Sequence, residues 1–109
     1  MTTDQLARAF VALGDPTRRR VFELVADRAR SVGELAGELP VSRPAVSQHL
    51  KVLTEAGLVT PSAAGVRRIY HLDPDGLAGL RSYLERFWTR SLAAFAEAAR
   101  DEHDRQEQP

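Results

Sequence analysis

The chain has 109 residues, of which 43% are hydrophobic and 28% are charged, the balance of a single globular domain. It contains no cysteine, which excludes disulfides, thiolate metal sites, iron–sulfur clusters and cysteine nucleophiles. Fifteen basic residues match fifteen acidic ones, so the net charge indicates no partner. No apolar run approaches the ~20 residues of a membrane span, and residues 1–5 lack a signal-peptide pattern. We therefore expect a cytoplasmic protein without a membrane partner.

The charges cancel over the whole chain but are unevenly distributed along it. Residues 40–72 hold four basic residues and one acidic residue, a net charge of +3. Residues 96–109 hold two basic and five acidic residues, a net charge of −3. A basic middle beside an acidic end points weakly to a polyanionic partner, and charge scattered by chance over a solvated surface explains it about equally well.

Two helices are predicted before residue 30. Apolar residues recur at helical spacing in the first one, at Leu6, Ala9, Phe10 and Leu13, and Gly14 ends it. Asp15 can cap the second helix with its carboxylate, and Pro16 suits the first helical position because no N–H is needed there.

A short helix and a longer one follow, joined by a tight turn. Ser31 and Glu34 form a capping box at the start of the short helix, which Pro40 ends. Ser42 caps the longer helix, whose apolar side carries Val46, Leu50 and Leu53. Gly57 occupies the left-handed position that commonly ends a helix.

The hydrophobic period then changes from 3.6 to 2, which predicts a two-stranded hairpin. Its strands are residues 59–62 and 67–72, joined by a turn at residues 63–66. Pro61 lacks an N–H and therefore places the first strand at an edge. Arg67 and Arg68 leave the second strand on opposite faces because successive side chains alternate.

A last helix begins at Asp73–Asp75 and is predicted to run to about Arg100. It has two adjacent apolar stripes, Leu77, Leu80, Leu84 and Phe87 in one and Trp88, Leu92, Phe95 and Ala99 in the other. Residues 1–100 are thus predicted to form one domain, and residues 101–109 a polar, disordered tail.

The predicted fold is mainly α with a small β-hairpin, in the order α-α-α-α-β-β-α, which is a winged helix-turn-helix. The helix after Ser42 has an apolar face for docking and an outer face of residues that can reach bases and phosphates. The predicted DNA-contacting residues are Ser42, Arg43, Pro44, Ala45, Ser47, Gln48, His49 and Lys51 on this helix, with Arg67 and Arg68 on the hairpin.

Two other classes of protein compete with this interpretation. An enzyme is disfavoured, because Ser47 and His49 do not face each other on a helix and the seven glycines are dispersed. A protein–protein interaction module that uses the long last helix remains an alternative, with Phe87 and Trp88 as interface anchors.

Four motifs resemble the ArsR/SmtB family of bacterial repressors, and the resemblance covers the chain from about Leu6 to Ala99. They are Leu13-Gly14-Asp15-Pro16-Thr17-Arg18-Arg19, Ser47-Gln48-His49-Leu50-Lys51-Val52-Leu53, Ala56-Gly57-Leu58-Val59 and Arg68-Ile69-Tyr70-His71-Leu72. The resemblance implies a homodimeric winged-helix repressor with its recognition helix at residues 43–56 and its wing at residues 59–72. It also implies a dimer interface on the first and last helices, here Leu6, Phe10, Leu13, Leu77, Leu80, Leu84, Phe87, Trp88, Leu92 and Phe95.

The chain departs from the metal-sensing members of that family. One sensor type carries a Cys-x-Cys pair where this chain has residues 31–36, which contain no sulfur. Another places Asp and His ligands on the last helix, where the matching positions appear as Pro74, Gly76, Phe87 and Arg90. The resemblance is therefore to members without metal ligands, some of which repress their own operon, and we expect no metal and no cofactor.

Overall fold

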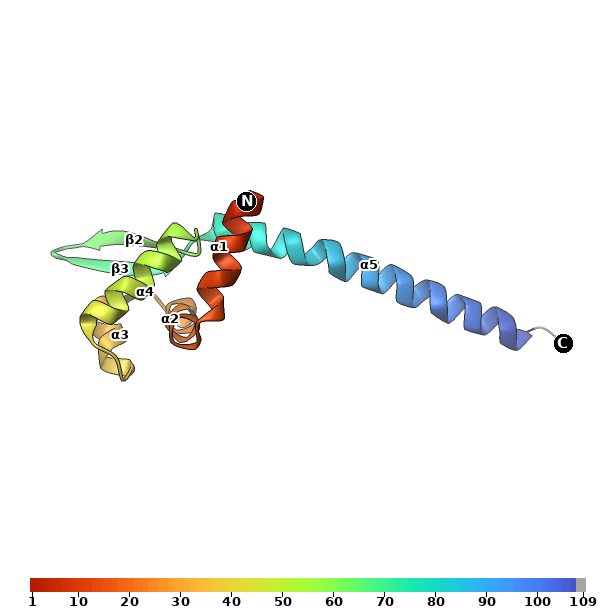
Figure 1. The fold of residues 1–109 in the computed structure, drawn as a ribbon, viewed down its shortest axis with the longest axis horizontal. Helices are drawn as coiled ribbons and strands as arrows, with labels where there is room; N and C mark the ends of the chain where they lie inside the picture. The colour runs from red at the N-terminus through yellow and green to blue at the C-terminus, as the bar shows by residue number, and fades with distance from the viewer. Residues whose placement is uncertain (108–109) are drawn as a thin grey trace. The chain divides into compact units, whose positions relative to one another are not determined.

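The computed structural model describes residues 1–107, and its elements follow the predicted order with one added strand (Figure 1). The chain divides into two compact units, Met1–Gly79 and Leu80–Pro109. None of the helices in the described part has the length and apolarity needed to cross a membrane. The elements are α1 (Thr3–Gly14), α2 (Pro16–Asp27), β1 (Arg30–Ser31), α3 (Val32–Glu38), α4 (Arg43–Glu55), β2 (Val59–Ala64), β3 (Arg67–Leu72) and α5 (Pro74–Glu107).

The helices begin at the caps that the sequence predicts. The Asp15 carboxylate accepts the Arg18 backbone N–H at 2.8 Å, and the Ser42 hydroxyl accepts the Ala45 N–H at 3.3 Å. Both partners of the capping box of α3 are in place, Ser31 with Glu34. Each cap satisfies backbone donors that the first helical turn leaves without intrahelical partners.

Two consecutive arginines at the start of α2 hold the end of α1. The Arg18 guanidinium donates to the carbonyls of Ala12 at 2.7 Å and Val11 at 3.2 Å. Arg19 donates to the carbonyl of Leu13 at 3.1 Å. The last carbonyls of a helix lack intrahelical donors, so these two side chains stabilise the corner between α1 and α2.

The sheet has three strands in the order β1-β3-β2, whereas the sequence predicts a two-stranded hairpin. The added strand is the pair Arg30 and Ser31, which lies opposite Tyr70 and Ile69 of β3. Two residues are too short to show an alternating pattern, so their pairing is decided by the tertiary fold. β2 lies at the edge, as the proline at position 61 predicts.

The hairpin turn is shorter than predicted. β2 continues through Ala64, which pairs with Arg67, so only Gly65 and Val66 connect the strands. Gly65 has a φ of +65°, and glycine at the first position of a two-residue loop is typical of the turns that match strand twist.

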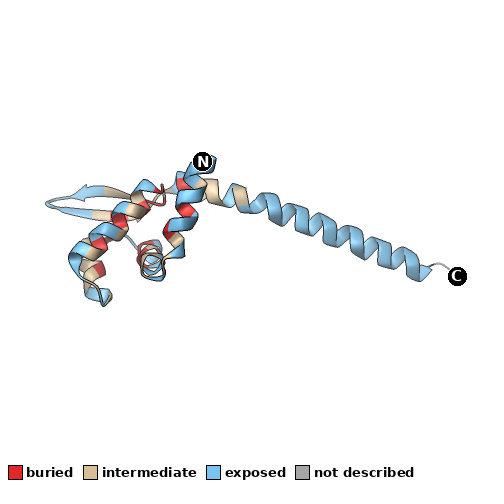
Figure 2. Ribbon diagram, viewed as in Figure 1, coloured by how far each residue is buried: buried red, intermediate tan, exposed pale blue. Residues whose placement is uncertain are grey.

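The hydrophobic core lies in the unit Met1–Gly79. The apolar side of α4 is fully buried, as predicted, at Val46, Leu50 and Leu53. Figure 2 shows buried residues on α1, α2 and α4. Because α4 packs on this core through its apolar side, its opposite side is open to solvent.

The last helix is longer than the sequence predicts. It continues past Arg100 to Glu107, so residues 101–107 are helical in this structure and not a disordered tail. Residues 108–109 of that predicted tail lie outside the described residues. The His103 imidazole lies 2.8 Å from the Glu107 carboxylate, a side-chain pair at the spacing that supports a helix, and polar residues do not by themselves end one.

The start of α5 closely approaches the end of α4. Gly57 ends α4 with a φ of +76°, and the Asp73 N–H donates to the carbonyl of Leu58 at 3.0 Å. A Cβ atom at Gly76 would overlap the Gly57 carbonyl oxygen. The glycine at 76 therefore allows the two backbones to meet.

We expect Gly76→Ala to lower the free energy of unfolding by about 1–3 kcal/mol, because the added methyl group must push backbone apart. Gly37→Ala is the matched control, since a Cβ there meets nothing within 4 Å. That control should gain roughly 0.5–1 kcal/mol from helix propensity. Urea unfolding measures the free energy of unfolding of both variants. Equal changes would contradict the close approach of Gly76 to the Gly57 backbone.

Candidate nucleic-acid interface

The outer side of α4 presents polar side chains to solvent. Arg43, Ser47, Gln48 and Lys51 are exposed on the helix whose other side packs into the core. Ser42 and Pro44, at its start, are exposed as well. No acidic residue lies on α4 before Glu55. A helix docked in this way can place amide, hydroxyl and cationic groups into a DNA groove about 12 Å wide.

Ala45 and His49 differ from the other predicted contact residues on α4 because they are half-buried. The His49 Nδ1 atom is buried and has no hydrogen-bond partner among the described residues. Asp15 has a pKa below its usual value, mainly because its carboxylate accepts the Arg18 backbone N–H, with a smaller contribution from His49. The His49 side chain is thus partly covered by the fold and less open to solvent than Ser47 and Gln48 beside it.

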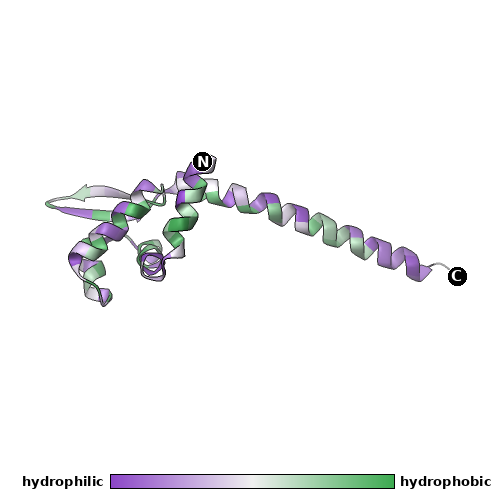
Figure 3. Ribbon diagram, in the orientation of Figure 1, coloured by the Kyte–Doolittle hydropathy of each residue, from purple (hydrophilic) through white to green (hydrophobic). Residues whose placement is uncertain are grey.

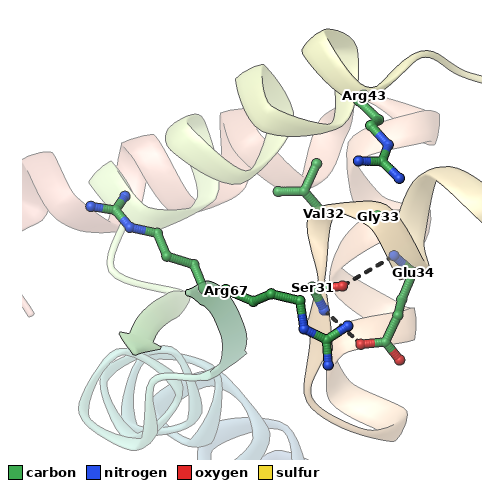
Figure 4. Close-up of a pocket in the computed structure, with 7 residues that line it drawn as sticks. Ser31, Val32, Gly33, Glu34, Arg43 and Arg67 are labelled. Carbon is green, nitrogen blue, oxygen red and sulfur yellow. Dashed lines mark hydrogen bonds between the residues drawn. The ribbon is translucent and has the colours of Figure 1, made fainter. Parts of the chain in front are cut away.

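The predicted wing consists of β2 and β3 and carries two exposed arginines, Arg67 and Arg68. Figure 4 shows two arginine side chains leaving the strand in opposite directions, as strand alternation requires. Tyr70, two residues after Arg68, is buried. Arg68 therefore lies on the same side of β3 as Tyr70, which is the side directed toward the core.

A pocket of about 420 Å³ lies between the start of α3, the first turn of α4 and the wing (Figure 4). Arg43, Arg67 and Arg68 line it together with residues 31–34. None of residues 31–34 is among the DNA-contacting residues that the sequence predicts. Gly33 lines the pocket, and a Cβ built there would lie 3.2 Å from the Arg43 Nη2 atom, so Arg43 lies close to it in a way that no local sequence pattern signals.

Glu34 supplies the pocket's only carboxylate among its lining residues, and that group is already engaged. It accepts the Ser31 N–H at 3.2 Å and an Arg28 guanidinium N–H at 3.1 Å. These bonds, the backbone one first, hold the pKa of Glu34 below its ordinary value of 4.5.

We expect the capping box of α3 to make stability depend on acid pH. A depressed pKa in the folded state means that the charged form stabilises the fold above the unfolded-state pKa. That contribution is lost as pH falls from about 4.5 through the lower folded-state pKa. Glu34→Gln keeps a capping side chain but removes the titrating carboxylate. Between pH 6 and 3, the free energy of unfolding of this variant should therefore fall less steeply than that of the wild type. Parallel declines would contradict this role.

The side chains predicted for a dimer interface differ in exposure. On α5, Leu84, Phe87, Trp88, Leu92 and Phe95 are exposed, Trp88 by 65% and Phe95 by 75%. Figure 3 shows apolar positions along this helix. Leu77 and Leu80 are half-buried, as are Leu6 and Leu13, whereas Phe10 is exposed. A helix with an exposed apolar stripe of this size is suited to contact another protein surface.

Metal-binding side chains do not converge in the described part of the chain. Within residues 1–107, no group of three or more His, Asp or Glu residues is placed to hold a metal ion. The positions Pro74, Gly76, Phe87 and Arg90 that match a family metal site lie on α5 and offer no oxygen or imidazole ligand from their side chains.

Comparison with known proteins agrees with this geometry. Residues 13–61 match a family model described as a helix-turn-helix domain. HTH-type transcriptional regulator Rv2034 of Mycobacterium tuberculosis is 58% identical over 97 residues, which cover 89% of this chain and 91% of the relative. An ArsR-like transcriptional regulator from Rhodococcus superposes with a TM-score of 0.72 at 35% identity, over 88% of this chain and 93% of that one.

The chain belongs to the ArsR/SmtB family of helix-turn-helix transcriptional regulators. It is accordingly a DNA-binding regulator with the winged helix-turn-helix fold that the sequence predicts, α3 and α4 forming the helix-turn-helix and β2 and β3 the wing. A further neighbour is a homodimeric winged helix-turn-helix DNA-binding domain from Mycobacterium bovis, with a TM-score of 0.65 and 27% identity over 79% of this chain and 80% of that one.

Proposed function

We propose that this ArsR/SmtB-family protein is a dimeric repressor that binds a pseudo-palindromic operator. The observation that carries the proposal is the exposed side of α4, which has no acidic residue before Glu55 at its end, beside the exposed arginines of the wing. Two relatives support its finer parts. SdpR of Bacillus subtilis, 31% identical over 64 residues, is a transcriptional repressor, and the Mycobacterium bovis neighbour is homodimeric.

The proposed contacts divide into those that read bases and those that bind the DNA backbone. Gln48 has the amide that pairs bidentately with adenine, and Arg43 reaches guanine or a phosphate. Lys51 and the wing arginines bind phosphates, which gives affinity without sequence information. Two such modules about 34 Å apart would read the two halves of the operator. The remaining predicted contacts are Ser42, Pro44, Ala45, Ser47 and His49.

The proposal includes several negative statements. The protein acts in the cytoplasm without a cofactor, without an enzymatic step and without a response to metal ions. The proposal of no metal response rests on the sequence, which lacks the sulfur ligands of one family sensor type and the Asp and His ligands of the other. The proposal includes repression of its own operon, which the family resemblance implies for some members without metal ligands.

A second candidate function is a module that binds a different protein through α5. The exposed side chains of Leu84, Trp88 and Phe95 favour it. Genome-wide capture of bound DNA, followed by footprinting of the best site, separates the two candidates. A dimeric repressor yields a footprint with two symmetric halves, and a protein that uses α5 for a different partner yields no such symmetric footprint.

We expect Arg67→Ala to weaken binding to operator and random DNA alike. Loss of one phosphate contact flattens the log–log dependence of affinity on salt by about one unit. Arg68→Ala should have a smaller effect, because its side of β3 is the one that carries buried Tyr70. Fluorescence anisotropy at several salt concentrations measures both slopes. If neither variant changes affinity or slope, the hairpin is not a DNA-contacting wing.

A further inference from the structure

The corner between α1 and α2 has a single residue outside both helices. Asp15 separates Gly14 from Pro16, and its carboxylate accepts the Arg18 N–H at the start of α2. A residue that precedes a proline is restricted to extended backbone, and Asp15 has a φ of −80° and a ψ of 124°. Because the ring of Pro16 also fixes its own φ, the backbone of this corner has little freedom to bend.

Side chains of α2 also hold the last turn of α1. The Arg18 guanidinium spans two consecutive carbonyls, donating from Nε to Ala12 at 2.7 Å and from Nη2 to Val11 at 3.2 Å. Arg19 donates to the next carbonyl, that of Leu13. The last four carbonyls of a helix have no intrahelical donor, and α2 thus supplies donors to three of those at the end of α1. The planar fork of a guanidinium suits two neighbouring oxygens.

These hydrogen bonds matter because the covered side chains of α1 are small. Of its twelve residues, Ala9 and Ala12 are buried, and two methyl groups give little apolar burial. The same helix carries Phe10 and Val11, which are 45% and 70% exposed. α2 in turn packs against α4. The corner therefore connects a helix with exposed apolar side chains to the support of the helix that is proposed to read DNA.

We propose that Arg18 is a positioning residue for operator binding. By clamping α1 to α2, it fixes the separation and orientation of the two α4 helices in the dimer. This rests on the proposed function, in which α1 belongs to the interface between two copies of the chain. A stiff connection raises the effective concentration of the second α4 at its half-site once the first is bound. Arg18 itself is not among the proposed DNA contacts.

The test compares the full operator, as defined by footprinting, with a duplex that holds one half-site. Arg18→Met removes the guanidinium donors and keeps an unbranched side chain. We expect it to weaken binding to the full operator about tenfold and to change half-site affinity less than about twofold, because a looser corner lowers only the effective concentration. A loss of folded protein would instead weaken binding to both duplexes equally.

The matched control is Arg20→Met. Arg20 lies on the same helix and pairs with Glu23, and both side chains are exposed. This variant removes the same charge without touching the corner, and it should keep the wild-type affinity for both duplexes.

A second readout is the spacing of the two half-sites, which the geometry of a dimer determines. The wild type should lose affinity when one base pair is inserted between the half-sites or deleted there. Arg18→Met should discriminate less among these operators. Arg19→Met, which loses one carbonyl contact, should show the same change to a smaller extent, and it carries the test if Arg18→Met does not fold.

The proposal is overturned if both variants keep the wild-type ratio of full-operator to half-site affinity and the wild-type spacing preference. It is also overturned if Arg18→Met sediments as a monomer at the concentration used, because the side chain would then act on dimer stability. Failure of the proposed function looks different, since the wild type itself would then gain no affinity from a second half-site.

Discussion

Replacing Gln48 with alanine is expected to lower affinity for the operator by about 1–3 kcal/mol per half-site, and far less on random DNA. The side chain is exposed on α4, whose opposite side is anchored by fully buried Val46 and Leu50. Removing the amide therefore leaves the helix docked and deletes only a group that reads a base. Because a dimer uses two half-sites, the loss of binding free energy on a symmetric operator should approach twice the loss for one half-site.

Lys51→Ala is the matched comparison for Gln48→Ala. Both residues are exposed on the same helix, but an ammonium group contacts phosphates and carries little sequence information. Lys51→Ala should weaken operator and random DNA to a similar extent and reduce the salt slope. Titrations of both variants with operator DNA and with random DNA decide which of the two side chains reads bases and which binds phosphates. If Gln48→Ala weakens the two DNAs equally, Gln48 does not read bases.

Replacing Trp88 with glutamate is expected to convert a dimer into a monomer. Trp88 is 65% exposed on the single chain and belongs to the apolar stripe that also carries the exposed side chains of Leu92 and Phe95. Buried aromatic anchors commonly contribute at least about 2 kcal/mol to an interface, and a carboxylate at the same position would have to be buried without a partner. Operator binding should weaken in parallel, because a monomer contacts only one half-site.

Ala93→Glu is the control for Trp88→Glu, because it introduces the same charge at another exposed position of α5. Residue 93 is five positions after Trp88, so its side chain lies on a different face of the helix. The control variant should remain dimeric. Sedimentation velocity of the full chain at micromolar concentration, without DNA, measures both. A wild type that sediments as a monomer contradicts the proposed dimer, and capture of a different protein by the same stripe would favour the interaction module.

Local interactions explain why so much of the fold can be predicted from the sequence. The caps at Asp15, Ser31 and Ser42 act over three residues, and the buried side of α4 repeats at helical spacing. The left-handed glycine at the end of that helix also acts locally. Signals of this range are contained in a short window of sequence, so both the helix-turn-helix and the exposed polar face of α4 were predictable.

Features that join distant segments were decided by the tertiary structure. β1 pairs Arg30 with Tyr70 across forty residues of chain, and two residues carry no periodic signal of their own. The arginine at position 18 caps α1 through a corner whose geometry depends on how α2 packs. The need for glycine at position 76 arises from a backbone contact with Gly57.

The pocket is the functional feature that depends most on the tertiary fold. The sequence by itself determines which residues are cationic and on which predicted elements they lie, and it places Arg43 and the β3 arginines more than twenty residues apart. Only packing of α3 and α4 beside the wing brings them around one cavity. The physical reason is that hydrogen-bonded periodicity acts within a few residues, whereas the position of one element against another is set by the shared core they bury.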